Sequence, residues 1–281
     1  MPIFKEVSSL DPIEEGLRIL IQGPVSSGKS FLAASIGEPN KKAYIFDFDG
    51  KLSALARHPN AANIVGKSYL DPSGQQGAVE KPTAFEQLLL DIGELEYQKK
   101  IGKLQPAYYI FDTLTFLEAS ALRLEMYKNP SARNSITIGG SSIHVPSGYD
   151  VYKAVKIEME YLIFRLFALG DTIVNAHERP EIDRTVSSKA KEDERITGLY
   201  SLEPPRLNVL KSLFKDKYRV SRIGGQHIVS LQSNDDFLGA CTFNGVKDHE
   251  EADLAKIIAK HREFMAKKKV PTLALPEGKV S

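Results

Sequence analysis

The segment Gly23–Ser30, with the sequence GPVSSGKS, constrains the fold more than any other part of the chain. It matches the pattern G-x-x-x-x-G-K-[ST] in full, because glycines and a Lys-Ser pair stand at the required positions. The short apolar run 17–22 precedes it and reads as a buried strand, and 30–36 reads as a helix. Glycines let backbone amides turn inward around an anion. The pattern therefore predicts a phosphate-binding loop between a strand and a helix.

Each position of this loop is a candidate nucleotide ligand, and the cofactors it predicts are ATP and Mg²⁺. Lys29 is expected to reach the β- and γ-phosphates and to take part in catalysis, and the Ser30 hydroxyl is expected to bind the metal. The helix that follows adds its positive N-terminal end. The alternative is a plain glycine turn that joins a strand to a helix. The predicted cofactor-binding residues are Gly23, Pro24, Val25, Ser26, Ser27, Gly28, Lys29, Ser30 and Phe31.

The order of strands and helices predicts an α/β fold. Further apolar runs at 43–46, 107–111 and 171–175 read as strands buried on both faces, which is typical of a parallel sheet. A Thr83–Glu86 capping box predicts the start of a helix, and the apolar residues after it have helical spacing. Apolar residues with helical spacing also predict a helix over 151–168. We therefore predict a mostly parallel central sheet flanked by helices.

The C-terminal third of the chain has a different pattern. Two alternating runs, 217–223 and 226–231, flank Gly224-Gly225 and predict an antiparallel hairpin. An amphipathic helix is expected over 248–269, with a loose tail after it.

Two acidic residues at strand ends are candidates for the chemistry. Asp112 ends the apolar run before Thr113 and is the predicted second metal ligand beside Ser30; the alternative is a helix-capping Asp. Asp49 follows the strand after the loop and is the predicted base that activates water, with Asp47 structural. The alternative for Asp49 is a turn residue before Gly50.

His177 is the third catalytic candidate. It follows Asn175 at the end of the fourth strand, where a polar side chain can hydrogen-bond the γ-phosphate. The alternative is a strand-end cap with a solvated imidazole.

Composition excludes several classes of protein and site. The 281 residues carry 37 basic and 36 acidic side chains, so the chain is not a globally basic nucleic-acid coat. The single cysteine, Cys241, excludes an internal disulfide and a cysteine-based zinc site. Because no apolar run approaches the length of a membrane span or signal peptide, we expect a cytoplasmic protein with no membrane partner.

Charge distribution gives weak support for polyanion binding. Long loops are expected at 128–149 and 179–205, and loops of this length are usually functional or disordered. Bases and acids in 181–203 number four and six, which is unfavourable for a phosphate backbone. The predicted C-terminal helix is more basic, and a solvated helix face is the alternative explanation for it.

The motifs GPVSSGKS, FDFDG, YYIFDTLT, NAHERP and KYRVSRIGGQHIVSLQS together resemble the RecA-like P-loop ATPase core, over about 16–243. The closer resemblance is to phage-type AAA-family ATPases that accompany single-strand annealing and single-strand-binding proteins. The resemblance implies ATP hydrolysis by a homo-oligomer with nucleotide at the subunit interface, and single-stranded DNA as a partner. It places the catalytic carboxylate at Asp49, where the family usually has the longer Glu. We accordingly divide the chain into a RecA-like ATPase domain, 1–247, and a basic helix with a flexible tail, 248–281.

Two other functions stay open from the sequence. One is a nucleotide-gated scaffold or loader without turnover, which the short Asp49 favours. The other is a small-molecule P-loop kinase, which the few arginines of 179–205 disfavour. The candidates for a cation supplied to a neighbouring subunit are Lys217, Arg206, Arg219 and Arg222.

Overall fold

A mostly parallel sheet forms the centre of the molecule. The computed structural model describes residues 16–71, 81–138, 141–182, 196–200, 212–231 and 241–267. Within them, eight strands form one sheet in the order β12-β11-β10-β1-β7-β4-β2-β3. The run from β10 to β3 is parallel throughout, whereas β11 and β12 are antiparallel to their neighbours. The predicted fold class, a mostly parallel sheet with a C-terminal antiparallel hairpin, is confirmed.

The strands of this sheet are β1 (Arg18–Gly23), β2 (Lys42–Asp47), β3 (Ile64–Ser68), β4 (Ala107–Asp112), β7 (Asp171–His177), β10 (Asp216–Ile223), β11 (Gln226–Ser230) and β12 (Glu250–Glu251). The helices are α1 (Lys29–Ala34), α2 (Ala84–Lys100), α3 (Leu114–Lys128), α4 (Tyr149–Leu169) and α7 (Leu254–Lys267), with short 3-10 turns at η2 (Leu52–Arg57), η3 (Ala61–Asn63) and η4 (Pro130–Ala132).

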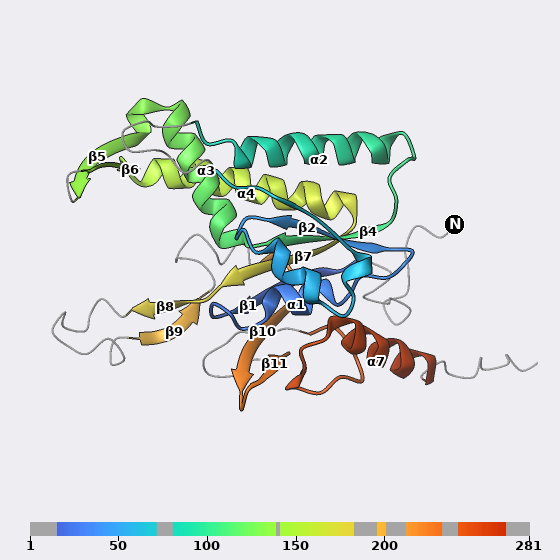
Figure 1. Cartoon of the computed structure of the whole chain (residues 1–281). Coiled ribbons are helices and arrows are strands. Elements are labelled where there is room, and N and C mark those ends of the chain that lie inside the picture. The colour runs from blue at the N-terminus through green and yellow to red at the C-terminus, as the bar shows by residue number, and fades with distance from the viewer. Residues whose placement is uncertain are drawn as a thin grey trace, which may run out of the picture.

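Helices cover both faces of the sheet (Figure 1). Helices α2, α3 and α4 pack on one face, against side chains such as Leu20 of β1 and Tyr109 of β4. Helices α1 and α7 pack on the other face, against alternate residues of the same strands, such as Ile19 and Tyr108. Successive residues of a strand point to opposite faces, so strands buried on both sides are apolar throughout. This is why the short apolar runs predicted the strands correctly.

The strand order gathers the predicted strand ends at one edge of the sheet. β1, which leads into the phosphate loop, lies between β7 and β10, and β7 lies between β1 and β4. β2 pairs with β4 so that Asp47 stands opposite Asp112. All these strands are parallel, and their carboxyl ends therefore meet in one place, where ligands of open α/β sheets bind.

The predicted Thr83 capping box is wrong. Thr83 is the N-cap of α2, but its side chain makes no capping hydrogen bond. The backbone amides of Thr83 and Ala84 donate instead to Asp71, each at 3.0 Å. Glu86 forms ion pairs with Lys81 and Lys128 and does not return to the cap. A carboxylate from an earlier segment thus satisfies the first amides of the helix.

Hairpin strands occupy much of the first predicted long loop and two short stretches of the second. β5 (Arg133–Ile138) pairs with β6 (Ser141–Pro146), and β8 (Arg179–Ile182) pairs with β9 (Ile196–Tyr200), both antiparallel. The rest of the second segment, 183–195 and 201–205, lies outside the described residues. Both hairpins stand on the side toward which β7 points (Figure 1). Apolar alternation in β5 and β6 is confined to 135–138 and 142–145, within a segment rich in Ser, Gly and Asn that is typical of a loop.

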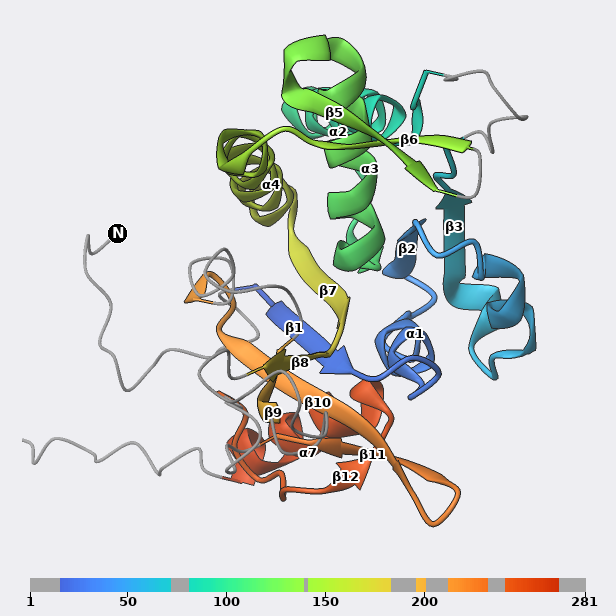
Figure 2. The same ribbon diagram turned by 90° about the vertical axis from the view of Figure 1, so that its left-hand side faces the viewer.

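The predicted C-terminal hairpin is confirmed, since β10 and β11 pair across Gly224-Gly225. It extends beyond the body of the molecule in Figure 2. Helix α7 begins at Leu254, six residues later than predicted, because 250–251 form β12. Its buried side chains, among them Ile257, join the core on the α1 face. The division at residue 247 stays a prediction, and 268–281 lie outside the described residues.

No helix among the described residues combines the length and the apolar character that crossing a membrane requires.

Candidate functional site

The loop after β1 has the backbone conformation of a phosphate cradle. Ser26 and Gly28 both adopt left-handed conformations, with φ of 62° and 97°. Gly28 is the N-cap of α1, and no side chain caps the first amides of this helix. Ser27 is 3% exposed, and its hydroxyl has no hydrogen-bond partner among the described residues.

Lys29 lies at the centre of this loop. Its side chain is buried, and its Nζ donates to the carbonyl oxygens of Gly23 and Pro24, at 2.9 and 2.7 Å. Burial lowers the pKa of this ammonium to about 8, against the opposing attraction of Asp112 and Glu178. A buried cation held at the mouth of an amide-lined turn is suited to an anionic ligand.

Asp112 and Ser30 form the candidate metal site. Asp112 is 4% exposed, and both the Ser30 hydroxyl and the Asn175 amide donate to its carboxylate. Burial raises the pKa of Asp112, and the nearby charges of Asp47 and Asp49 raise it further. A cation bound beside it would offset this cost, and carboxylate and hydroxyl oxygens suit Mg²⁺.

The two acidic residues at and just after the end of β2, Asp47 and Asp49, have different roles. Asp47 is buried and accepts hydrogen bonds from the amides of Asp49 and Leu52, both at 3.0 Å, and from the Ser68 hydroxyl at 2.7 Å. It therefore holds the turn, which is the structural role expected for it. Asp49 lines the pocket and pairs with Lys51 at 2.6 Å. β2 ends at Asp47, so strand periodicity does not carry on to Asp49.

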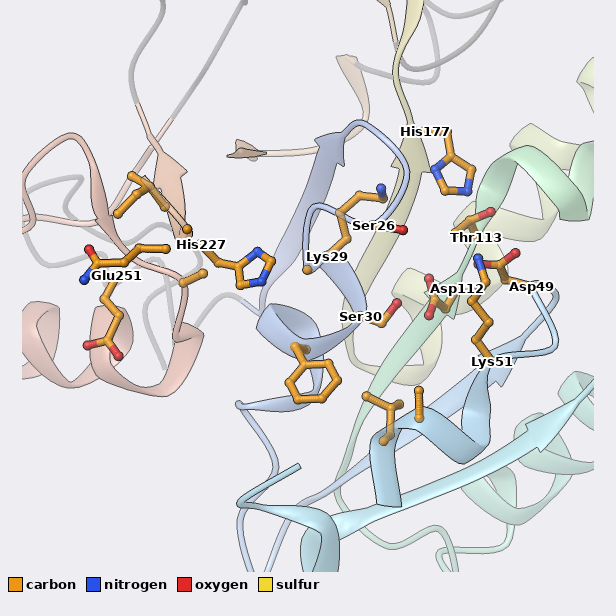
Figure 3. Close-up of a pocket in the computed structure, with 18 residues that line it drawn as sticks. Ser26, Lys29, Ser30, Asp49, Lys51, Asp112, Thr113, His177, His227 and Glu251 are labelled. Atoms are coloured by element: carbon orange, nitrogen blue, oxygen red, sulfur yellow. The ribbon is translucent and has the colours of Figure 1, made fainter. Parts of the chain in front are cut away.

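His177 lies at the end of β7 and lines the same pocket. Its backbone amide donates to the Thr115 hydroxyl at 3.1 Å, and its ring meets Phe116 edge-on, with centroids 5.7 Å apart. Figure 3 shows the imidazole on the same flank of the pocket as Asp49 and Asp112.

These groups share one cavity of about 1030 Å³. Of the predicted cofactor-binding residues, Ser26, Gly28, Lys29, Ser30 and Phe31 line it; Gly23, Pro24, Val25 and Ser27 do not. We call one of its flanks the acidic side, formed by Asp49, Asp112, Thr113 and His177. The opposite flank is the hairpin side, formed by Gly225, Gln226, His227, Ile228, Glu251 and Ala252.

The hairpin side was missed from the sequence. His227 Nδ1 lies 2.6 Å from the carbonyl oxygen of Ser27, and since a carbonyl only accepts, the imidazole donates. A Cβ on Gly28 would lie 2.8 Å from the same nitrogen. A Cβ on Gly23 would clash with the Val220 carbonyl oxygen of β10. Both motif glycines are thus in close contact with the hairpin. No signal in the sequence marked His227, which lies 200 positions after Ser27.

The donor set fits a magnesium-bound nucleoside triphosphate. A phosphate cradle, a buried cation and a hydroxyl-carboxylate pair occur together, and the unpartnered Ser27 hydroxyl lies in the loop. No group of three or more His, Cys, Asp or Glu side chains suited to a metal occurs in the described parts of the chain. Mg²⁺ is usually held by one or two protein groups together with substrate phosphates, and Ser30 and Asp112 are two such groups.

Basic groups proposed from the sequence are mostly paired within the chain. Arg219 forms a two-fold hydrogen-bonded pair with Glu178, at 2.8 and 3.2 Å, so its guanidinium is engaged in its own subunit. Arg222 is exposed, and Arg206 lies outside the described residues. The described α7 cations also contact carboxylates: Lys256 with Glu251, Lys260 with Glu250, Arg262 with Glu38 and Lys267 with Glu263. This pairing reduces the positive surface expected of the helix.

Comparisons with known proteins give only distant likenesses. No family model matches the chain, and no curated protein matches it. One structural match is a prototypical ATPase from the type III secretion system of pathogenic bacteria, with 14% identity, a TM-score of 0.43, and coverage of 74% of this chain and 52% of that one. EscN from enteropathogenic E. coli matches in complex with its central stalk EscO, with 14% identity, a TM-score of 0.45, and coverage of 92% and 57%.

Assembled EscN from the same organism's type III secretion system also matches, with 14% identity, a TM-score of 0.39, and coverage of 74% and 43%. The chain thus spans about half the length of these proteins. At these TM-scores the likeness carries no weight for function, which has to be argued from the site.

Proposed function

We propose that the chain binds and hydrolyses ATP with Mg²⁺, as a RecA-like P-loop protein. The observation that carries this proposal is the buried Asp112, whose carboxylate accepts a hydrogen bond from Ser30, the residue directly after Lys29 in the loop. A strand–loop–helix in sequence gives a phosphate site, and a carboxylate from a separate strand supplies the second metal ligand. The bound Mg²⁺ would neutralise charge that develops on the phosphates.

Within this proposal the residues have distinct roles. Lys29 binds the β- and γ-phosphates, Ser30 and Asp112 hold the metal, and Asp49 accepts the proton of the attacking water. His177 contacts the terminal phosphate from the end of β7. The pair between Asp49 and Lys51 has to open or shift for Asp49 to act as a base, since its carboxylate is engaged at 2.6 Å.

The Asp49–Lys51 pair favours a second candidate, a nucleotide-gated scaffold or loader without turnover. An acid one methylene shorter than Glu and already paired is a weak base. The two candidates differ in one measurement, because the scaffold binds ATP tightly and releases no phosphate.

The finer proposal is a homo-oligomeric recombination or replication accessory that acts on single-stranded DNA, with a single-strand-binding or annealing protein as a further partner. It is supported by the sequence resemblance and by the hairpins β5–β6 and β8–β9 at the carboxyl side of the sheet. The segment 128–149 carries Lys128 and Arg133 and no acid. The paired cations of α7 argue against that helix as the main DNA contact.

The test is a phosphate-release assay with and without single-stranded DNA, on wild type and Lys29→Ala. We expect Mg²⁺-dependent turnover that DNA increases, and loss of ATP binding in Lys29→Ala because the buried cation is removed. A matched control is Lys41→Ala, a lysine that pairs with Asp171 and lies outside the pocket. ATP binding without turnover would favour the scaffold. Equal turnover with and without DNA, and no DNA binding at low salt, would reject the DNA-linked part alone.

A further inference from the structure

Thr113 has a hydroxyl that the fold does not use. The residue is 1% exposed, and its Oγ1 has no hydrogen-bond partner among the described residues. Thr113 is the N-cap of α3, where a threonine hydroxyl ordinarily accepts from an amide in the first turn, yet it makes no such bond. Since buried polar groups are nearly always paired, a hydroxyl that also leaves its capping role unfilled indicates a ligand.

The surroundings of Thr113 identify the kind of ligand. It lines the pocket directly after the metal-site residue Asp112, and Figure 3 shows it close to Asp49 and His177. The phosphate loop cradles the α- and β-phosphates, and Lys29 reaches on to the γ-phosphate. We therefore place the third phosphate at the acidic side of the pocket. Asp112 and Asp49 also lie on the acidic side, and ionised carboxylates only accept hydrogen bonds. An anionic phosphate bound there therefore needs a hydrogen-bond donor from another residue.

We propose that the Thr113 hydroxyl donates a hydrogen bond to the terminal phosphate and thereby distinguishes nucleoside triphosphate from diphosphate. The inference rests on the proposed function and deepens it, because it names the residue that reads the third phosphate. Hydrogen bonds to a charged acceptor are the stronger kind, so one such bond gives a measurable preference.

The test compares the affinities of a non-hydrolysable ATP analogue and of ADP, both with Mg²⁺, for a set of variants. Thr113→Val keeps the side-chain shape and removes the hydroxyl, and Thr113→Ser keeps the hydroxyl. Thr172→Val is the matched control: Thr172 is equally buried but bonds the Gly170 carbonyl at the opposite end of β7. Thr113→Ala repeats the measurement if the Val variant does not fold, as judged by circular dichroism.

We expect Thr113→Val to weaken binding of the ATP analogue by about tenfold or more and to leave ADP binding within about twofold. Thr113→Ser and Thr172→Val should keep the wild-type ratio of the two affinities. Equal loss for both nucleotides, no loss for either, or a Ser variant that behaves like Val overturns the inference. If the wild type binds neither nucleotide, the proposed function itself falls and takes this inference with it. If Lys29→Ala abolishes binding while the Thr113 variants match wild type, only the inference falls.

Discussion

The acidic side and the hairpin side of the pocket are formed by different kinds of secondary structure. On the acidic side, the functional groups are side chains at or just after the ends of the adjacent parallel strands β2, β4 and β7. On the hairpin side, an antiparallel pair contacts the main chain of the phosphate loop, through His227 on the Ser27 carbonyl. The acidic side can supply charge and proton transfer, whereas the hairpin side sets the shape of the loop. Mutations of Asp49 and of the hairpin side should therefore separate catalysis from binding.

The largest effect that would sharpen this contrast is expected on the acidic side. Asp49→Asn should lower kcat for ATP hydrolysis at least about 100-fold with little change in KM, because it removes the proposed base but keeps the side-chain size. Asp47→Asn should instead lower the free energy of unfolding, since Asp47 binds backbone amides of the turn. Steady-state kinetics and chemical denaturation of both variants measure the difference. Unchanged turnover in Asp49→Asn would remove Asp49 from the chemistry.

An intermediate effect is expected on the hairpin side. In Gly28→Ala the added Cβ would contact the His227 ring, and the alanine would have to adopt a φ of 97°. Both costs distort the loop, so this variant should weaken ATP binding by about 10- to 100-fold. Adding His227→Ala removes the contact but not the backbone strain, so the double variant should recover part of the affinity. Titration with a fluorescent ATP analogue measures each variant. A double variant as weak as Gly28→Ala would show that His227 does not constrain the loop.

The smallest effect concerns Lys29, which lies between the two sides. Its pKa of about 8 means that the free protein loses this charge as pH rises above 8, whereas bound phosphate favours the charged form. Binding then takes up a proton, so ATP affinity should be flat below pH 8 and should fall by about tenfold per pH unit above it. Calorimetric titrations between pH 7 and 9.5 measure this. Lys29→Arg serves as the control, because a guanidinium keeps its charge; an equal fall in that variant would place the titration elsewhere.

How well each side of the pocket could be predicted depends on how far apart along the chain the interacting residues lie. The four central strands and the residues Lys29, Ser30, Asp49, Asp112 and His177 were placed from local patterns, because a buried strand and a glycine-rich turn are recognisable within about ten residues. Asp49 lines the pocket and Asp47 holds the turn, as expected from the sequence, but the Asp49–Lys51 pair depends on the shape of that turn and was not predicted. His227 depends on a sheet pairing between β1 and β10. Such long-range register leaves no local pattern.

The hydrogen bond from His227 to Ser27 also bears on how the protein is made. A chain emerging from the ribosome has all of its acidic-side residues once position 177 has been synthesised, yet the hairpin that presses on Gly23 and Gly28 is still missing. The nucleotide site would therefore form in two stages during translation. In a nascent chain that ends before β10, the phosphate loop would lack its contacts with the β10–β11 hairpin.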